Sequence, residues 1–300
     1  MDTRSIRYFL AIAQEENISK AAEKLHMSQP PLSRQLKQLE EELGVELFYR
    51  DKSRIFLTEA GYFLKERATE IVELVDKTEA QMREIYQQGS GNIYIGTIET
   101  VGNSLLPRWI SGFNRLYPDI TYHVNNSNTD ETMKKIDSGV YDIGIVREPF
   151  NSEKYESVRL PEETWIACMS HNHSLARRSE KTVNLSELAA EHLILPGRSI
   201  HEEQIKKWFE LLGTKPRVIC WYTALVNGLA LVENEIGVLL CPKSAAALVL
   251  GREDIIYKEI INPRLTSSAV VIWKKERRLT ASVLRFIEYI KEETNLGIDK

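Results

Sequence analysis

The sequence contains few cysteines, and this scarcity excludes two kinds of structural site. Among its 300 residues only Cys168, Cys220 and Cys241 are cysteines, an odd number at wide spacing. Such a set favours neither a disulfide framework nor a zinc ligand set, and it is typical of reduced thiols in the cytosol. We therefore expect a cytoplasmic protein with no metal and no cofactor.

Long apolar runs are lacking as well. No stretch approaches the length of a membrane span, and the first seven residues mix charges into an amphipathic pattern that is unlike a signal peptide. Low-complexity tracts and sequence repeats are also absent. Because 300 residues exceed what one ordinary core organises, we expect at least two domains, without membrane association.

An excess of basic residues is missing too. The formal net charge is −4, and residues 1–88 hold 13 Lys and Arg against 16 Asp and Glu. Binding to a nucleic-acid backbone would therefore depend on a local basic cluster, which comprises Arg34, Lys37, Arg50, Lys52 and Arg54. So few phosphate contacts predict weak non-specific affinity and a modest dependence on salt.

The most informative stretch that is present runs from Ser28 to Gly44. Its leucines recur at intervals of four, three and four residues, which predicts one helical stripe: Leu32, Leu36, Leu39 and Leu43. Ser28 is a suitable N-cap, prolines are tolerated in a first helical turn, and Gly44 favours the helix end.

The opposite face of this helix is polar. It carries Gln29, Pro30, Ser33, Arg34 and Lys37. Glutamine and arginine side chains of such a face can bind adenine and guanine, while serine and lysine bind bases or phosphates. The stripe alone is equally consistent with an amphipathic helix whose polar face meets only water.

The residues just upstream favour the DNA interpretation. Residues 18–25 form an alanine-rich helical pattern, and His26-Met27-Ser28 makes a short turn into the leucine-striped helix. Two helices joined by a tight turn are typical of a helix-turn-helix, whose second helix lies in the major groove.

Many positions of this region resemble the LysR-type transcriptional regulators. The matching residues are Ser19-Lys20-Ala21-Ala22, Ser28-Gln29-Pro30-Pro31-Leu32-Ser33, Leu36, Leu39-Glu40, Leu43-Gly44, Leu47-Phe48, Arg50 and Leu57-Thr58-Glu59-Ala60-Gly61. The resemblance implies a winged helix-turn-helix over residues 1–58. It also implies DNA contacts by Ser19, Ser28, Gln29, Pro30, Ser33, Arg34, Lys37, Arg50 and Arg54.

The other parts of such a domain can be placed as well. Thr3 is a candidate cap for a first helix whose apolar face comprises Ile6, Phe9, Leu10 and Ala13. Residues 47–57 read as a hairpin wing with a basic tip, which the resemblance places along the DNA backbone and minor groove. A solvated turn is the alternative for Arg54.

A long helix follows, capped by Thr58 and extending to about residue 88. Its apolar positions alternate by four and three residues: Leu64, Ala68, Ile71, Val75, Thr78, Met82 and Ile85. A small winged domain offers such a seam no neighbour, so we expect residues 59–88 to be a linker helix that dimerises with a second copy. Packing against the next domain is the alternative.

Beyond a hinge at residues 89–91 the pattern becomes strand–helix alternation, which predicts a parallel sheet with right-handed crossovers. We expect strands at 92–98, 120–124, 141–146, 165–169, 193–195, 218–220, 237–240 and 269–273. Helices are expected at 105–116, 129–138, 201–212, 224–233 and 281–293.

This part resembles the LysR-type regulatory domain, which has the two-lobed α/β fold of a periplasmic binding protein. The resemblance implies a regulatory domain over 92–300, with lobe one at 92–162 and 268–300 and lobe two at 163–267. The whole chain is then an α+β multidomain protein: winged helix-turn-helix, long linker helix and two-lobed α/β domain.

A ligand of such a fold binds beyond the carboxyl ends of the strands, near helix N-termini that favour anions. The candidate residues there are Thr100, Val101, Asn128, Arg147, Pro196, Arg198 and Thr223. Their donors suit a small carboxylate as effector. Glu99 and Glu148 are either surface charges or the partners of an amine on the effector.

Two other function classes are less favoured. The best enzyme-like cluster is Cys168, His171 and His173, but His173-Ser174-Leu175-Ala176 resembles a His-Pro-Leu-Ala turn of the same regulatory domain. No phosphate loop or nucleophile motif is found, so no catalytic residue is predicted. A stand-alone solute-binding protein would lack the helix-turn-helix signature.

We therefore expect a sequence-specific transcription regulator rather than an enzyme. Its partners would be double-stranded DNA with a dyad-symmetric site, a small-molecule effector that modulates DNA binding or bending, and further copies of the chain as a dimer of dimers. RNA polymerase is a further partner for a regulator of this kind.

Overall fold

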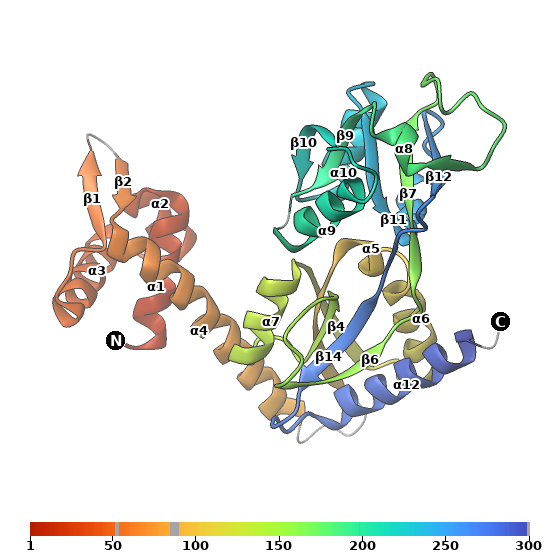
Figure 1. Cartoon of the computed structure of the whole chain (residues 1–300). Coiled ribbons are helices and arrows are strands. Elements are labelled where there is room, and N and C mark those ends of the chain that lie inside the picture. The colour runs from red at the N-terminus through yellow and green to blue at the C-terminus, as the bar shows by residue number, and fades with distance from the viewer. Residues whose placement is uncertain (52–53, 85–89, 198, 299–300) are drawn as a thin grey trace. The chain divides into compact units, whose positions relative to one another are not determined.

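The computed structural model describes residues 1–51, 54–84, 90–197 and 199–298 (Figure 1). Its contacts divide the chain into two compact units. One comprises Met1–Gln88 with Ser138–Val140, and the other comprises the rest of the chain. Each unit is described by itself below.

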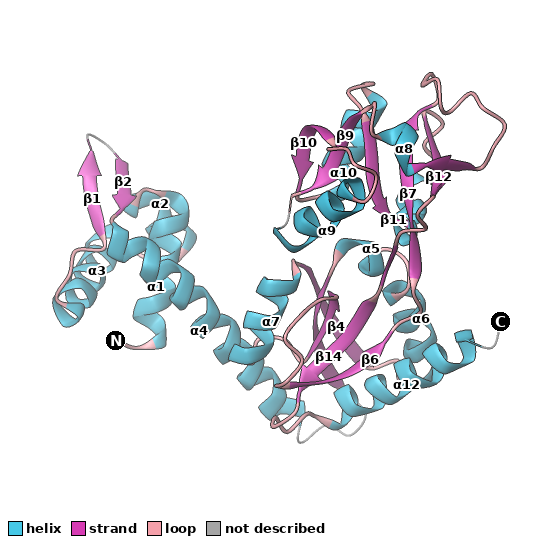
Figure 2. Cartoon of the chain, viewed as in Figure 1, coloured by secondary structure: helices cyan, strands magenta, loops and turns pink. Residues whose placement is uncertain are grey.

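The amino-terminal unit is a three-helix core with a hairpin and a long helix (Figure 2). Its elements are α1 (Thr3–Glu15), α2 (Ile18–Lys24), α3 (Gln29–Leu43), β1 (Phe48–Asp51), β2 (Arg54–Leu57) and α4 (Glu59–Glu84). The two strands pair antiparallel, as a wing requires. Ile12, Ala21 and Leu32, all fully buried, bring the first three helices into one core. The predicted winged helix-turn-helix is thus confirmed.

The predicted cap of the first helix is wrong, whereas Ser28 stands at the predicted N-cap of α3. Asp2, not Thr3, caps α1, because its Oδ1 accepts the Ser5 backbone N–H at 2.7 Å. Ser28 occupies the N-cap of α3 but makes no side-chain capping bond. At the other end Gly44 takes the left-handed conformation (φ 70°), as expected, while Leu43 is 38% exposed rather than part of the buried stripe.

Helix α4 packs on the helix-turn-helix core, which corrects the prediction that its seam has no neighbour there. Ala68 is fully buried, and Leu64 and Val72 pack against the same core beside α1. Further along α4, Ile71 and Met82 are exposed. The predicted seam therefore has an inner part, which holds the helix on its own domain, and an outer part that remains uncovered. Its last position, Ile85, lies outside the described residues.

Thr58 forms the joint between the wing and α4. Its Oγ1 accepts the Gly61 N–H at 3.0 Å and donates to the Glu46 carbonyl at 2.7 Å. The first bond satisfies one of the N–H groups that a helix start leaves without a partner. The predicted capping role of Thr58 is confirmed.

Replacing Thr58 with alanine should lower the free energy of unfolding of this unit by about 1 kcal/mol, since both bonds are lost. Urea unfolding followed by circular dichroism measures the change. Thr58→Ser keeps the hydroxyl and is expected to retain most of the stability. Equal losses in the two variants would contradict a capping role.

In the second unit, a five-stranded sheet organises the first lobe, in the order β4-β3-β5-β14-β6. Its elements are β3 (Gly91–Thr97), α5 (Glu99–Gly102), α6 (Leu106–Leu116), β4 (Ile120–Asn126), α7 (Thr129–Ser138), β5 (Ile143–Arg147), β6 (Tyr155–Arg159), β14 (Ala269–Lys274) and α12 (Ala281–Ile298). Strand β3 is parallel to β4 and β5, whereas β14 is antiparallel to β5 and β6. The sheet is therefore mixed and not parallel throughout.

Alternation along the strands assigns the two faces of this sheet. Ile93 and Ile95 point into the core that includes α6 and α12. The opposite face carries Gly96 and Gly144, where an added Cβ would lie 2.4 Å from Tyr141 and 2.5 Å from Ile136. These glycines let α7 approach the sheet closely.

The second lobe is built on a larger sheet, in the order β10-β9-β11-β7-β12-β8. Its elements are β7 (Glu163–Ser170), β8 (Thr182–Asn184), α8 (Leu185–Leu188), β9 (His192–Pro196), α9 (Ser199–Glu210), β10 (Arg217–Tyr222), α10 (Leu225–Glu233), β11 (Val238–Pro242), the 3₁₀ turn η1 (Lys243–Ala245), α11 (Ala246–Val249), β12 (Ile255–Ile261) and β13 (Thr266–Ser267). Strands β7, β9 and β11 are buried on both faces, which explains their continuous apolar sequences.

Two antiparallel segments connect the lobes. Strand β7 enters the second lobe, and β13 returns beside it with Thr266 opposite Thr164 before the chain continues into β14. The chain thus crosses between the two predicted lobes twice, once in each direction. Within the described ranges, no helix is both long and apolar enough to cross a membrane.

Candidate nucleic-acid interface and inter-lobe site

One face of α3 packs into the core of its domain, so the opposite, polar face is exposed to solvent. Leu32, Leu36 and Leu39 are at most 7% exposed. Gln29, Pro30, Arg34 and Lys37 are exposed, and Ser33 is half-buried. The structure thus places these predicted residues together along one helix, with all but Ser33 exposed.

The neighbouring candidates extend this face. Ser19, at the start of α2, and Ser28, before α3, are both exposed. Arg54 is exposed at the start of β2, while Arg50 lies on β1 with its side chain outside the described residues. Lys52 also lies outside the described residues. Lys37 Nζ is 3.4 Å from Glu41, and both side chains are largely exposed.

Glu40 fixes the wing to α3, a role that the sequence analysis missed. Its Oε1 accepts the backbone N–H groups of Leu47 at 2.7 Å and Phe48 at 3.2 Å. One carboxylate thus sets where the wing begins relative to the helix. The sequence does contain a signal for this role. Glu40 lies next to the leucine stripe of an amphipathic helix, and a partly buried carboxylate there needs a hydrogen-bond donor.

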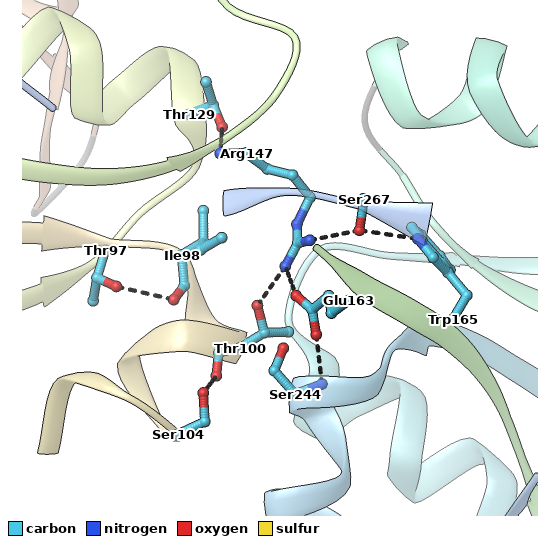
Figure 3. A network of polar contacts seen from close by, with 10 residues as sticks. All are labelled: Thr97, Ile98, Thr100, Ser104, Thr129, Arg147, Glu163, Trp165, Ser244 and Ser267. Atoms are coloured by element: carbon cyan, nitrogen blue, oxygen red, sulfur yellow. Dashed lines mark hydrogen bonds and ion pairs between the residues drawn. The ribbon is translucent and has the colours of Figure 1, made fainter. Parts of the chain in front are cut away.

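In the second unit, Arg147 is the centre of a buried polar network between the lobes (Figure 3). It ends β5 and is only 4% exposed. Its guanidinium donates to Ser267 Oγ at 2.7 Å, to Thr100 Oγ1 at 3.0 Å and to Glu163 Oε1 at 2.9 Å. The arginine charge is therefore neutralised by Glu163 before any ligand arrives.

The network continues on both sides of Arg147. Trp165 Nε1 donates to Ser267 Oγ at 3.1 Å, and the Ser244 backbone N–H donates to Glu163 Oε2 at 2.7 Å. The carboxylate of Glu163 thus joins Arg147 in the first lobe to Ser244 in the second. The two charges of this largely buried pair stabilise each other, because either partner alone would be costly to bury.

Next to this network lies a cavity of about 70 Å³ between the lobes. Four of the seven predicted effector residues line it: Thr100, Arg147, Pro196 and Thr223. Glu99 and Tyr222 line it too. Burial raises the pKa of the Tyr222 hydroxyl well above its usual range, and its hydroxyl donates to the Leu240 carbonyl at 3.1 Å.

The structure does not bring two of the predicted residues, Asn128 and Val101, to this cavity. Asn128 caps α7, with its Oδ1 accepting the Glu131 N–H at 2.9 Å. Val101 is buried and lines a different, larger cavity of about 540 Å³ beside Leu160. Arg198 lies outside the described residues, so its role stays a prediction.

The enzyme-like cluster is dispersed. Cys168 is buried against Cys241, with 3.8 Å between the sulfurs, and burial raises the pKa of the Cys241 thiol well above its usual range. His173 lies in the turn after β7, where its Nδ1 accepts the Leu175 N–H. Within the described ranges, no group of three or more His, Cys, Asp or Glu is placed to hold a metal ion.

Comparison with known proteins decides the family. Residues 3–62 match the bacterial regulatory helix-turn-helix protein of the lysR family, and residues 86–295 match the LysR substrate binding domain. The second match alone covers more than half of the chain. The chain belongs to the LysR family.

Full-length relatives agree with this assignment. HcaR, the Hca operon transcriptional activator of Escherichia coli K12, is 28% identical over 295 residues, which cover 97% of this chain and 98% of HcaR. The crystal structure of the LysR family regulator CbnR is 26% identical, with a TM-score of 0.84 over 98% of this chain and 99% of CbnR. CbnR in complex with its target DNA has a TM-score of 0.81 and 27% identity over 97% of this chain and 99% of CbnR.

This LysR family member is accordingly a DNA-binding transcription regulator with an effector-binding domain. Its relatives are transcription regulators and not enzymes. The helix-turn-helix match contains α1 to α3 and the wing, and the substrate-domain match contains both lobes.

Proposed function

We propose that α3 reads the major groove through Gln29, Pro30, Ser33, Arg34 and Lys37, with Ser19 and Ser28 at its N-terminal side. Arg50 and Arg54 of the wing contact the backbone. The observation that supports this best is the two-sided burial of α3: Leu32, Leu36 and Leu39 are buried, whereas four of the five proposed contact residues on the opposite face are exposed. Loss of sequence preference on substitution of the exposed residues tests it.

The proposed organisation is a cytoplasmic homo-oligomer, a dimer of dimers. In this organisation residues 1–58 bind DNA and residues 59–88 form the dimer contact. Residues 92–300 bind the effector: lobe one comprises 92–162 and 268–300, and lobe two comprises 163–267. Support comes from the uncovered part of α4, where Ile71, Leu74 and Met82 are 36–55% exposed. A second chain packed along this face would cover them.

A dimer would place two α3 helices on a dyad-symmetric DNA site. A regulator bound at that site could contact RNA polymerase.

Replacing Ile71 with lysine should raise the dissociation constant of the dimer at least ~10-fold, because a charge would be buried at the interface. Sedimentation over a range of concentrations measures it. Glu66→Gln changes the net charge by the same amount at an exposed α4 position off the seam, and should leave the constant unchanged. Equal constants in the wild type and Ile71→Lys would contradict dimerisation through this face.

We propose further that a small-molecule effector enters the inter-lobe cavity and contacts Thr100, Pro196 and Thr223. At about 70 Å³ the cavity admits few atoms. A metabolite must therefore bind a different lobe arrangement, and it shifts the population toward that arrangement. In a DNA-bound oligomer this shift would alter the spacing of the α3 helices and the bend of the DNA.

The expectation of a carboxylate effector is revised in this proposal. Arg147 is one of the donors on which that expectation rests, but its guanidinium already donates to Glu163, Thr100 and Ser267. An effector that offers neutral donors and acceptors to the threonine hydroxyls fits the site with less rearrangement.

The test is a screen of metabolites by thermal unfolding, followed by measurement of DNA bend and footprint with each ligand found. Binding in the cavity is established by loss of the effect in Thr223→Val. A ligand that binds there yet changes neither the footprint nor the bend contradicts the proposed coupling.

A further inference from the structure

Helix α10 begins in the cleft without a capping side chain of its own. Its N-cap is Ala224, which has no acceptor. The first N–H groups of a helix have no intrahelical partner, and alanine is among the poorest residues at this position. The start of α10 therefore depends on an acceptor from elsewhere in the molecule.

That acceptor comes from the other lobe. Glu99 Oε2 accepts the Leu225 backbone N–H at 2.7 Å. Glu99 begins α5, directly after β3 of the first lobe, whereas Leu225 is the first residue of α10 in the second lobe and is 2% exposed. A carboxylate at a helix N-terminus is favoured by both the hydrogen bond and the helix dipole.

The second positive group of the cleft is occupied in the same way. Arg147 binds Glu163 at 2.9 Å. Within the described part of the cleft, the start of α10 and the Arg147 guanidinium would both attract an anionic ligand, and each already holds a carboxylate of the protein itself. Glu99 lines the cavity directly, together with Thr100 and Thr223.

We propose that Glu99 is a specificity-determining residue of the inter-lobe site: it fills the anion position at the start of α10, joins the two lobes, and excludes small monocarboxylates from the cleft. The inference rests on the proposed function, since it concerns the same site. If Glu99 fills this position, the effector of the wild-type protein is a compound that does not need to place a single carboxylate at the start of α10.

Truncation of this side chain should create a site for acetate. Glu99→Ala removes a CH₂–COO⁻ group, which has the atoms of acetate. In the full chain without DNA, the thermal midpoint of Glu99→Ala should fall by about 2–4 °C. Sodium acetate, against sodium chloride at equal ionic strength, should recover at least half of that shift. The wild type should show no acetate-specific change.

Three controls separate this effect from general stabilisation. Acetamide has the shape of acetate without its charge and should not rescue Glu99→Ala. Glu99→Gln fills the same space and should show no response to acetate. Glu148→Ala removes a carboxylate of the same lobe that pairs with Arg159 on the surface, and should not respond either.

The proposal is overturned if acetate stabilises the wild type as much as Glu99→Ala, or if Glu99→Ala has the wild-type midpoint and no acetate response. Both readouts omit DNA and effector. A failure of the proposed function, seen as a ligand that leaves the DNA bend unchanged, is therefore distinguishable from a failure of acetate rescue.

Discussion

Replacing Arg147 with methionine is expected to lower the free energy of unfolding of the regulatory unit by about 3–5 kcal/mol. Arg147 is 4% exposed, and the side chain of its partner Glu163 is 18% exposed. Methionine fills much of the volume but leaves the carboxylate of Glu163 without its cation. Urea unfolding followed by tryptophan fluorescence measures the loss, since Trp165 belongs to the same network.

The chain offers a matched control for this substitution. Arg159 and Glu148 form an ion pair at the same distance, 2.9 Å, but their side chains are 64% and 37% exposed. Arg159→Met should therefore cost less than about 1 kcal/mol. Adding Glu163→Gln to Arg147→Met should recover part of the loss, because no unpaired charge remains. Equal losses at Arg147 and Arg159 would contradict the structural role assigned to the buried pair.

Replacing Arg34 with alanine is expected to weaken binding to the specific DNA site by about 1–3 kcal/mol while leaving non-specific DNA binding almost unchanged. Arg34 is exposed on the polar face of α3, one position beyond Ser33, so truncation leaves the buried leucines in place. Titration of a specific and a scrambled duplex at one stated salt concentration measures both affinities.

Lys37 provides the comparison on the same helix, one turn further along. Its ammonium group lies 3.4 Å from Glu41 and is largely exposed. Lys37→Ala should weaken binding to both duplexes alike and reduce the salt slope by about one, as expected for a phosphate contact. An equal loss on both duplexes for Arg34→Ala would make Arg34 a phosphate contact too, and would contradict its role in reading bases.

Much of the amino-terminal unit could be predicted from the sequence because its signals are local. The leucine spacing of α3, the left-handed Gly44 and the cap at Thr58 each depend on neighbours within a few residues. Apart from the cap of α1, the main failure in this unit arose where a distant element decides. Burial of Ala68 against the helix-turn-helix core could not be read from a heptad pattern that fits a dimer equally well.

In the regulatory unit, the sequence predicts where strands end but not what meets there. Strands β6 and β12 were missed, since their burial alternates only partly. Four predicted residues do meet at the cavity, because all four stand at or just after the carboxyl ends of parallel strands: Thr100 and Arg147 in the sheet of the first lobe, Pro196 and Thr223 in that of the second. That Arg147 is already satisfied could not be predicted, since its partners are 16 and 120 residues away in sequence.

The mechanism proposed for the chain depends on specific, two-fold symmetric binding by paired α3 helices. The most direct test is a genome-wide map of DNA fragments bound by the purified full-length protein at a stated salt concentration. We predict a small number of sites, each with a dyad-symmetric sequence, and loss of these sites in Arg34→Ala. Diffuse binding with no shared symmetric sequence, both with and without cell extract as a source of effector, would contradict the account.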